Sequence, residues 1–120
     1  MSRGRQGQSK TDSNEELAQA VRARLHSPVK ITLQDIAREL GVPERTLRRL
    51  FRDRFAISPG QYQLAVRLNL VKKQLQLAIT KGESVSEIAA RQGFLHMGRF
   101  SAQYRRLFGE TPSQTRQGMP

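Results

Sequence analysis

The sequence contains nearly the same short segment twice, at residues 32–41 and 84–93. In each copy a Ser or Thr stands three positions before an acidic residue, Ile-Ala follows, and Gly closes the segment. A hydroxyl followed by an acid at this spacing is typical of a helix start, and Gly supplies the left-handed turn that ends a helix. The similarity continues beyond the glycines: with one residue inserted in the second copy, residues 47–61 align with residues 100–114. The chain should therefore contain two related helical units.

Each copy has the order of a helix-turn-helix DNA reader, a short helix followed by a glycine turn and a second helix that carries arginines. Between the copies, apolar residues are spread around more than one face of the predicted helix, as expected if it contacts a core at each end. No alternating segment is long enough for a strand. The predicted fold class is all-α, with two helix-turn-helix subdomains joined by a long connector helix and about seven helices.

The domain organisation follows from these signals. After Met1 the first thirteen residues contain no apolar side chain, so they cannot bury enough surface to order themselves. The predicted segments are a flexible basic arm (1–13), the first helix-turn-helix subdomain (14–58), the connector helix (59–81) and the second helix-turn-helix subdomain (82–117).

The charge of the chain points to a polyanionic partner. The 120 residues include 21 Lys and Arg against 10 Asp and Glu, a net charge of +11 that stability does not require. There is no cysteine, which excludes disulfides and thiolate chemistry. No apolar run approaches the roughly 18 residues of a membrane span, and the N-terminus lacks the apolar core of a signal peptide. We expect a soluble, cytoplasmic protein associated with the nucleoid.

In the first copy, arginines project from the second helix on the sides that its apolar stripe leaves free. A guanidinium can bridge two acceptors of guanine in the major groove, so we expect base contacts from Arg45, Arg48 and Arg49. Arg52 is the candidate for a phosphate contact. The alternative is that these arginines form an ordinary solvated helix face.

The second copy offers a different set of side chains. Arg99 is the candidate for direct base readout, and Met97 could press against a thymine methyl group. His96, Gln103 and Arg106 are candidates for backbone contacts. For His96 and Met97, packing in the loop and the core is an equal alternative.

Catalysis finds little support in the sequence. It has no cysteine nucleophile, no cluster of histidines and carboxylates at metal-ligand spacing, and no glycine-rich phosphate loop. We therefore expect neither an enzyme nor a bound metal or cofactor.

The second copy carries the most specific pattern in the chain. Its elements are Ile88-Ala89, Gly93-Phe94, Arg99-Phe100-Ser101, Tyr104-Arg105, Phe108-Gly109 and Thr111-Pro112-Ser113. With these residues, the segment 31–116 resembles the C-terminal DNA-binding domain of AraC/XylS-type bacterial transcription regulators, and residues 93–100 look like the XylS-type branch.

The resemblance implies two helix-turn-helix subdomains joined by one long helix, each placing its second helix in successive major grooves. By position, base readout would fall on Arg45, Arg48 and Arg49 in the first subdomain. In the second it would fall on Met97, Gly98, Arg99 and Ala102. Gly98 and Ala102 cannot form side-chain hydrogen bonds, which implies weaker or shape-based readout by the second subdomain.

The leading functional prediction is sequence-specific binding of double-stranded DNA by a bacterial regulator, usually an activator in this family, with RNA polymerase as a further candidate partner. A nonspecific architectural nucleic-acid-binding protein is the main alternative, since counterion release drives both kinds of binding. A protein-interaction module that uses Glu15-Glu16 or the connector is a third. The chain is expected to be monomeric, without a sensing or dimerisation domain, either as an excised domain, which we favour, or as a stand-alone regulator.

Overall fold

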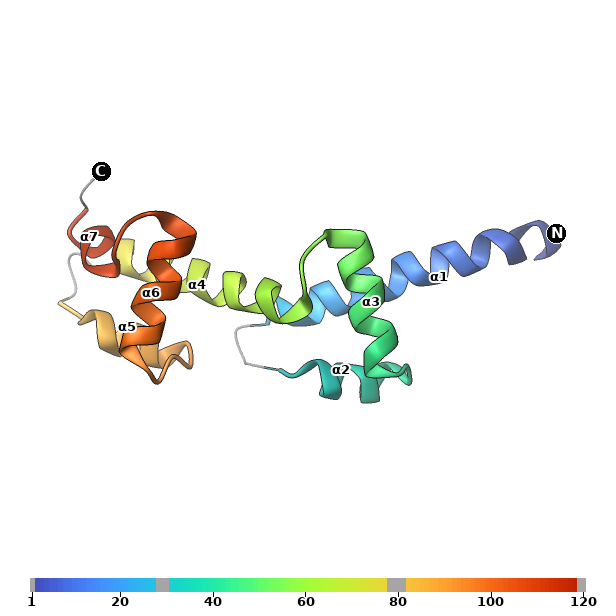
Figure 1. The fold of residues 1–120 in the computed structure, drawn as a ribbon, viewed down its shortest axis with the longest axis horizontal. Coiled ribbons are helices and arrows are strands. Elements are labelled where there is room, and N and C mark those ends of the chain that lie inside the picture. The colour runs from blue at the N-terminus through green and yellow to red at the C-terminus, as the bar shows by residue number, and fades with distance from the viewer. Residues whose placement is uncertain (1, 28–30, 78–81, 119–120) are drawn as a thin grey trace. The chain divides into compact units, whose positions relative to one another are not determined.

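The computed structural model describes residues 2–27, 31–77 and 82–118, with side chains from Ser13 onward. This part of the chain is helical and contains no strand (Figure 1). Its seven helices are α1 (Ser2–Leu25), α2 (Leu33–Leu40), α3 (Glu44–Phe55), α4 (Pro59–Leu77), α5 (Val85–Arg91), α6 (Met97–Phe108) and α7 (Pro112–Arg116). The predicted all-α fold class is confirmed.

The chain forms two compact units that divide inside α4, between Gln63 and Leu64. Each unit has a core of its own. In the first unit the buried core residues are Val21, Leu25, Ile36, Ala37, Leu47 and Phe51. In the second unit they are Leu68, Val71, Leu75, Ile88, Ala89, Phe94, Phe100 and Tyr104.

Helix α4 supplies side chains to both cores. Tyr62, near its start, packs against the core of the first unit, and Leu68, Val71 and Leu75 are buried in the second. This is the distribution that the spread of apolar residues predicted for the helix between the copies. The predicted end of the connector, at residues 78–81, lies outside the described residues.

The start of α1 differs from the prediction. The sequence predicted an unstructured arm followed by a helix from about residue 14, whereas α1 already begins at Ser2. The segment contains no proline, and Arg, Gln and Lys are good helix formers, so a helix anchored by the buried Val21 and Leu25 can extend backwards through it. The division of the chain at residues 13, 58 and 81 stays a prediction. Helix α1 ends at Leu25, just before the sequence His26-Ser27-Pro28, which favours a helix end because proline disfavours a helical residue before it; Pro28 itself lies outside the described residues.

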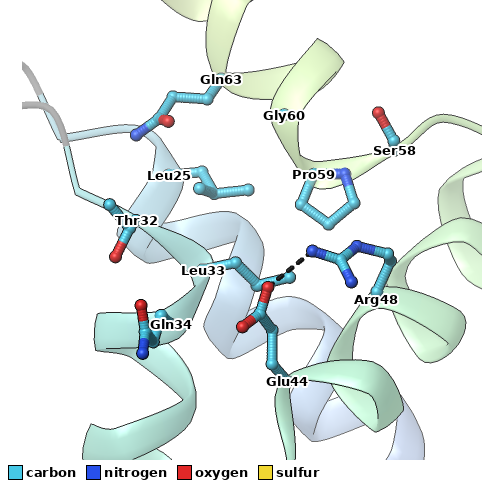
Figure 2. A pocket seen from close by; sticks show the side chains of 10 residues that line it. All are labelled: Leu25, Thr32, Leu33, Gln34, Glu44, Arg48, Ser58, Pro59, Gly60 and Gln63. Carbon is cyan, nitrogen blue, oxygen red and sulfur yellow. Dashed lines mark hydrogen bonds and ion pairs between the residues drawn. The ribbon is translucent and has the colours of Figure 1, made fainter.

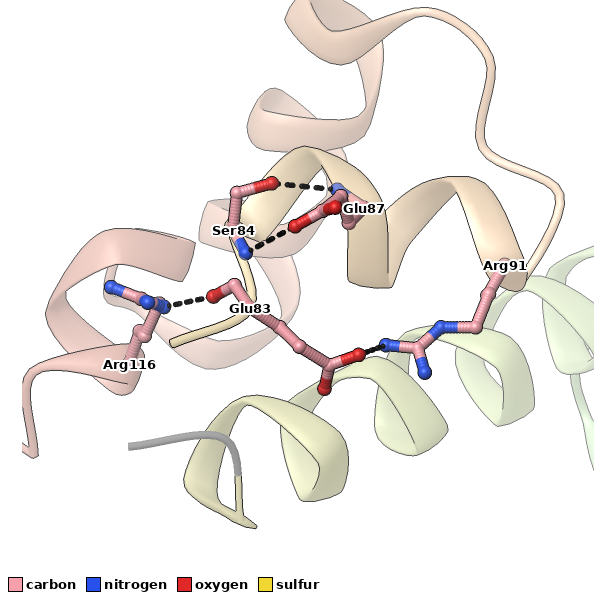
Figure 3. A network of polar contacts seen from close by, with 5 residues as sticks. All are labelled: Glu83, Ser84, Glu87, Arg91 and Arg116. Atoms are coloured by element: carbon pink, nitrogen blue, oxygen red, sulfur yellow. Dashed lines mark hydrogen bonds and ion pairs between the residues drawn. The ribbon is translucent and has the colours of Figure 1, made fainter. Parts of the chain in front are cut away.

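The two predicted helix starts are both capping boxes. The backbone amide of Glu87 donates to Ser84 Oγ at 3.1 Å, and the amide of Ser84 donates to Glu87 Oε1 at 2.9 Å (Figure 3). Thr32 and Asp35 form the same reciprocal pair at the start of α2, at 3.0 and 3.4 Å. In both boxes the carboxylate accepts a backbone hydrogen bond, which satisfies an amide that the helix start leaves without an intrahelical partner.

These hydrogen bonds give the start of α5 a pH dependence. The hydrogen bonds from Ser84 hold the pKa of Glu87 below its ordinary value of 4.5, so the carboxylate stabilises the folded state above that pH and the contribution is lost as the pH falls through the lowered pKa. Glu87→Gln keeps an acceptor for the Ser84 amide but cannot titrate. We expect its free energy of unfolding to fall less than that of the wild type between pH 5 and about 3, in urea denaturation at each pH. Equal losses would show that Glu87 does not contribute.

The two longer helices of the repeat correspond residue by residue. Helices α3 and α6 are both 12 residues long, and the buried Leu47 and Phe51 of α3 have their counterparts 53 positions later, in Phe100 and Tyr104. Each helix ends at a residue with a left-handed backbone, Ala56 at φ 61° and Gly109 at φ 74°. The alignment with one inserted residue is thus confirmed, and it gives each exposed position of α3 an equivalent on α6.

Candidate nucleic-acid interface

Four exposed arginines occupy one side of α3 and form what we call the arginine face: Arg45, Arg48, Arg49 and Arg52. Their spacing, i, i+3, i+4 and i+7, brings side chains to the same side of an α-helix. Leu47 and Phe51, both 0% exposed, fix the opposite side of the helix in the core of the first unit. The core therefore determines which side of α3 faces outward, and the first unit brings together all four of its predicted DNA contacts.

The arginine face is not uniform. Arg48 Nη2 lies 2.6 Å from Glu44 Oε2, an ion pair between successive turns of α3. Within the described ranges, Arg45, Arg49 and Arg52 form no ion pair with an acidic side chain. Three guanidinium groups are thus available to a ligand at once, and the fourth is held by a carboxylate.

The equivalent face of α6 carries much less charge. Counting 53 residues on from the arginine face gives four exposed residues: Gly98, Ser101, Ala102 and Arg105. Only one of them is charged, and two have side chains no larger than a methyl group. A helix face this small allows the backbone to approach a ligand closely, but it offers few directed hydrogen bonds.

The five side chains selected by their chemistry in the second copy do not gather on one face, whereas Gly98 and Ala102, which the family resemblance implies, both lie on the small face. Met97 is half-buried and packs against the core of the second unit, and Gln103 is half-buried as well. Arg99 and Arg106 are exposed, about a quarter-turn around α6 from the centre of the small face. His96 is exposed and precedes the first turn of α6 without a side-chain capping bond.

A buried arginine holds the turn between α5 and α6. Arg67 of α4 is 7% exposed and donates from Nε and Nη2 to the carbonyl oxygen of Gln92, at 2.9 and 2.6 Å. Its guanidinium lies 4.5 Å from the ring centroid of Phe94, and burial lowers its pKa. The next residue, Gly93, has φ +87°, and a Cβ there would lie 2.6 Å from Arg67 Nη2. The turn thus needs glycine for its backbone conformation, and a larger residue would also have to shift the tip of the Arg67 side chain.

Hydrogen bonds also fix α6 against α7. The Tyr104 hydroxyl donates to Thr115 Oγ1 at 2.7 Å, and the Thr115 hydroxyl donates to Glu110. Burial raises the pKa of Tyr104, and the nearby Glu110 carboxylate acts in the same direction. On the other side of the unit, Glu83 accepts from Arg116 Nε through its carbonyl oxygen at 2.6 Å and pairs with Arg91 through its carboxylate at 2.5 Å (Figure 3). The orientation of α6 is therefore set by its neighbours, as that of α3 is by its core.

Comparison with known proteins identifies this arrangement. A family profile described as "Helix-turn-helix domain" matches residues 36–118. A solved structure of a probable AraC family transcriptional regulator from Rhodopseudomonas palustris CGA009 is similar, with a TM-score of 0.79 and 26% identity over 88% of this chain and 99% of that chain. The chain belongs to the AraC/XylS family. An AraC-type DNA-binding domain from Chromobacterium violaceum is also similar, with a TM-score of 0.76 and 28% identity over 88% of this chain and 93% of that one.

Curated relatives of this AraC/XylS-family chain are transcription regulators. It is 35% identical to the "Probable thc operon regulatory protein" of Rhodococcus erythropolis, over 79% of this chain and 29% of that protein. It is also 35% identical to the "XylDLEGF operon transcriptional activator 2" of Pseudomonas putida, over 71% of this chain and 54% of that protein. The chain thus spans between about a quarter and half of the length of these relatives. It is a DNA-binding regulator domain and not an enzyme.

In the described part of this AraC-type domain, no helix is long and apolar enough to cross a membrane. The same residues contain no group of three or more His, Cys, Asp or Glu side chains that could hold a metal ion.

Several residues of the site were missed in the sequence. Ser101 and Arg105 were not predicted as DNA contacts. The alignment with one inserted residue nevertheless pairs them with Arg48 and Arg52 of the first copy. Arg67 received no role, although an arginine between Val66 and Leu68 in an apolar stretch is unusual. The ion pair of Glu44 with Arg48 was not predicted either, although an acidic residue four positions before a basic one on a helix commonly forms such a pair. The outward faces of α3 and α6 are thus shaped by residues outside the arginine pattern as well.

Proposed function

We propose that this domain binds an asymmetric DNA site with α3 and α6 in successive major grooves. The observation that carries the proposal is the arginine face of α3, which combines three free guanidinium groups with a helix side fixed by the core. In a helix-turn-helix protein the second helix of the motif enters the major groove, where arginine can bridge O6 and N7 of guanine. Arg45, Arg48 and Arg49 are the proposed base contacts, and Arg52 is the proposed phosphate contact.

The second helix plays a different part in this proposal. The small face of α6 approaches the groove closely, so Ala102 can contact a thymine methyl group while Ser101 and Arg105 bind a base edge or a phosphate. Arg106, Gln103 and His96 then flank the groove as backbone contacts, and Arg99, in the first turn of α6, is the proposed base contact at the edge of the small face. Met97 contributes through its exposed part only, because it also packs against the core.

The biological role is proposed from the relatives. Relatives from Pseudomonas putida are named as transcriptional activators of the XylDLEGF operon, which supports a role in transcription activation, with RNA polymerase as the partner on DNA. We propose that this chain binds its site as a monomer, since two reading helices already cover two grooves. It would act in the bacterial cytoplasm, where the nucleoid lies.

Selection of bound sequences from a random DNA library tests the proposal. The expected result is a bipartite consensus with centres about 10 bp apart, and a preference of at least ~10³ over scrambled DNA in a salt titration. A single half-site would show that α6 contacts mainly the backbone. No consensus, with equal salt dependence on both duplexes, would favour a nonspecific architectural protein.

Substitutions on the arginine face separate base contacts from phosphate contacts. Arg49→Ala is expected to cost about 1–3 kcal/mol of binding on the selected site and to relax specificity at one position. Arg52→Ala, one turn further along the same face, should weaken binding to all sequences alike and reduce the salt slope by about 1. Fluorescence anisotropy with selected and scrambled duplexes measures both. If Arg49→Ala weakened both duplexes equally, its base-reading role would be refuted.

A further inference from the structure

One arginine of the arginine face is directed into a pocket. Figure 2 shows Arg48 of α3 extending toward Glu44 and Pro59, with its guanidinium over a cavity of about 380 Å³ in the first unit. The cavity is lined by the starts of α2, α3 and α4, and both members of the ion pair belong to its wall. Neither is fully exposed: the side chains of Arg48 and Glu44 are 54% and 39% accessible. The carboxylate therefore holds the guanidinium at one edge of the arginine face.

This pairing changes how Arg48 can bind DNA. A free guanidinium contributes to binding on any sequence, since it replaces a counterion at a phosphate. The Arg48–Glu44 pair as a whole carries no net charge, because the carboxylate offsets the guanidinium, and Glu44 itself is repelled by phosphates. The guanidinium nevertheless has five N–H donors, so Arg48 can keep one edge on Glu44 and offer the other to a base. The pairing thus reduces the attraction of Arg48 to phosphates of any sequence and keeps its directed hydrogen bonds to a base.

We propose that Glu44 is a specificity-determining residue, which holds Arg48 for a directed base contact and reduces binding to DNA of the wrong sequence. The inference rests on the proposed function, because it requires α3 to read bases. Glu44 would act mainly as a repulsive element against wrong sequences, one of the two general routes to specificity. It would also fix the orientation of the arginine before binding, which lowers the entropic cost of the correct contact.

The second copy supports a dedicated role for the pair. The positions equivalent to Glu44 and Arg48 are Met97 and Ser101, so α6 has neither the acid nor the base. The equivalent buried positions Phe51 and Tyr104, by contrast, are aromatic in both copies. The ion pair is thus absent from the copy whose reading face is small, and it accompanies the copy whose reading face is rich in arginine.

The test compares Glu44→Gln with a matched control, Glu39→Gln. Glu39 also pairs with an arginine of the first unit, Arg24, but lies on α2, so the control makes the same change in net charge away from the arginine face. Binding to the selected site and to a scrambled duplex is measured by anisotropy over a series of salt concentrations. A third and a fourth variant, Arg48→Ala and Arg48→Ala with Glu44→Gln, complete a double-mutant cycle.

We expect Glu44→Gln to bind scrambled DNA about three- to tenfold more tightly, with a salt slope steeper by about 1, and to bind the selected site with little change. Loss of folding cannot produce tighter binding, so this readout is independent of stability. The effect should disappear in the Arg48→Ala background. The inference about Glu44 would be overturned if Glu44→Gln and Glu39→Gln changed the affinity for both duplexes alike, or if the effect of Glu44→Gln persisted in the Arg48→Ala background. Either result would leave the proposed function intact. If the wild type preferred no sequence, the proposed function would fail as well.

Discussion

Replacing Phe51 with alanine is expected to destabilise the first unit by about 3–5 kcal/mol while the core amides of the second unit stay protected. Phe51 is 0% exposed, and its ring centroid lies 4.7 Å from that of Phe55 and 5.5 Å from that of Tyr62. Its removal would leave a cavity among residues of α1, α3 and α4. Native-state hydrogen exchange, read amide by amide by NMR, should show lost protection in α2 and α3 and retained protection in α5 and α6.

The corresponding variant in the second unit is Phe100→Ala. Phe100 is 1% exposed in the core of the second unit, so its loss should open α5, α6 and α7 and spare α2 and α3. The two variants together test whether two separate clusters of buried residues mean two units that open separately. Loss of protection throughout the chain in both variants would show that the chain unfolds as one cooperative unit, and the expectation would be wrong.

Gly93→Ala is expected to cost about 2–4 kcal/mol of stability in the second unit. An L side chain at φ +87° carries a backbone cost of about 1–2 kcal/mol. The added methyl group would also displace Arg67 from the Gln92 carbonyl, which removes charge-assisted hydrogen bonds from a buried guanidinium. Urea denaturation followed by tyrosine fluorescence and circular dichroism measures the loss, and binding to the second half-site should weaken with it.

Gly41→Ala is the matched control. Gly41 closes the corresponding helix of the first copy at φ +67°, but a Cβ there would meet no atom within 4 Å. Only the backbone cost should remain, about 1–2 kcal/mol. The difference between the two glycine variants therefore measures what Arg67 contributes to the turn. Equal losses would mean that the guanidinium adjusts to the methyl group without cost.

The parts of the fold that could be predicted are those encoded over a few residues. The Thr32 and Ser84 boxes, the Gly41 turn and the equivalence of α3 with α6 depend on neighbours within one or two helical turns, and the repeat made each signal appear twice. The four-residue spacing of Phe100 and Tyr104, which are both buried, is likewise a local pattern of a helix with one apolar side. Local chemistry was sufficient for these elements.

Long-range contacts could not be predicted in the same way. The hydrogen bonds from Arg67 join residues 25 positions apart, and Gln63 donates to the carbonyl oxygen of Ile31 across 32 positions. No periodicity in the sequence pairs such residues. The start of α1 was predicted wrongly for a different reason. The composition indicated that the first residues have no apolar side chains to bury, but a helix can also extend backwards from a turn that is anchored further along the chain.

The residues predicted to contact DNA share one helix face in the first copy but not in the second. On α3 the arginines recur at helical spacing, so a prediction based on charge also selected residues of a single helix face. On α6 the DNA contacts were predicted from the chemistry of single side chains, and two of these, Arg99 and Met97, project from different sides of the helix. The face of α6 equivalent to the arginine face is defined by the equivalent buried residues, Leu47 with Phe100 and Phe51 with Tyr104, which fix the rotation of the helix.

The constant offset between α3 and α6 makes this domain suitable for engineering. Inward and outward positions are separate sets in both helices, so the four outward residues of α6 can be exchanged for those of α3 without altering a buried side chain. A chain with two arginine-rich readers, or with the two readers interchanged, would keep both cores and differ only in the DNA that it selects. Natural sequences with this repeat could change operator preference by the same route, one half-site at a time.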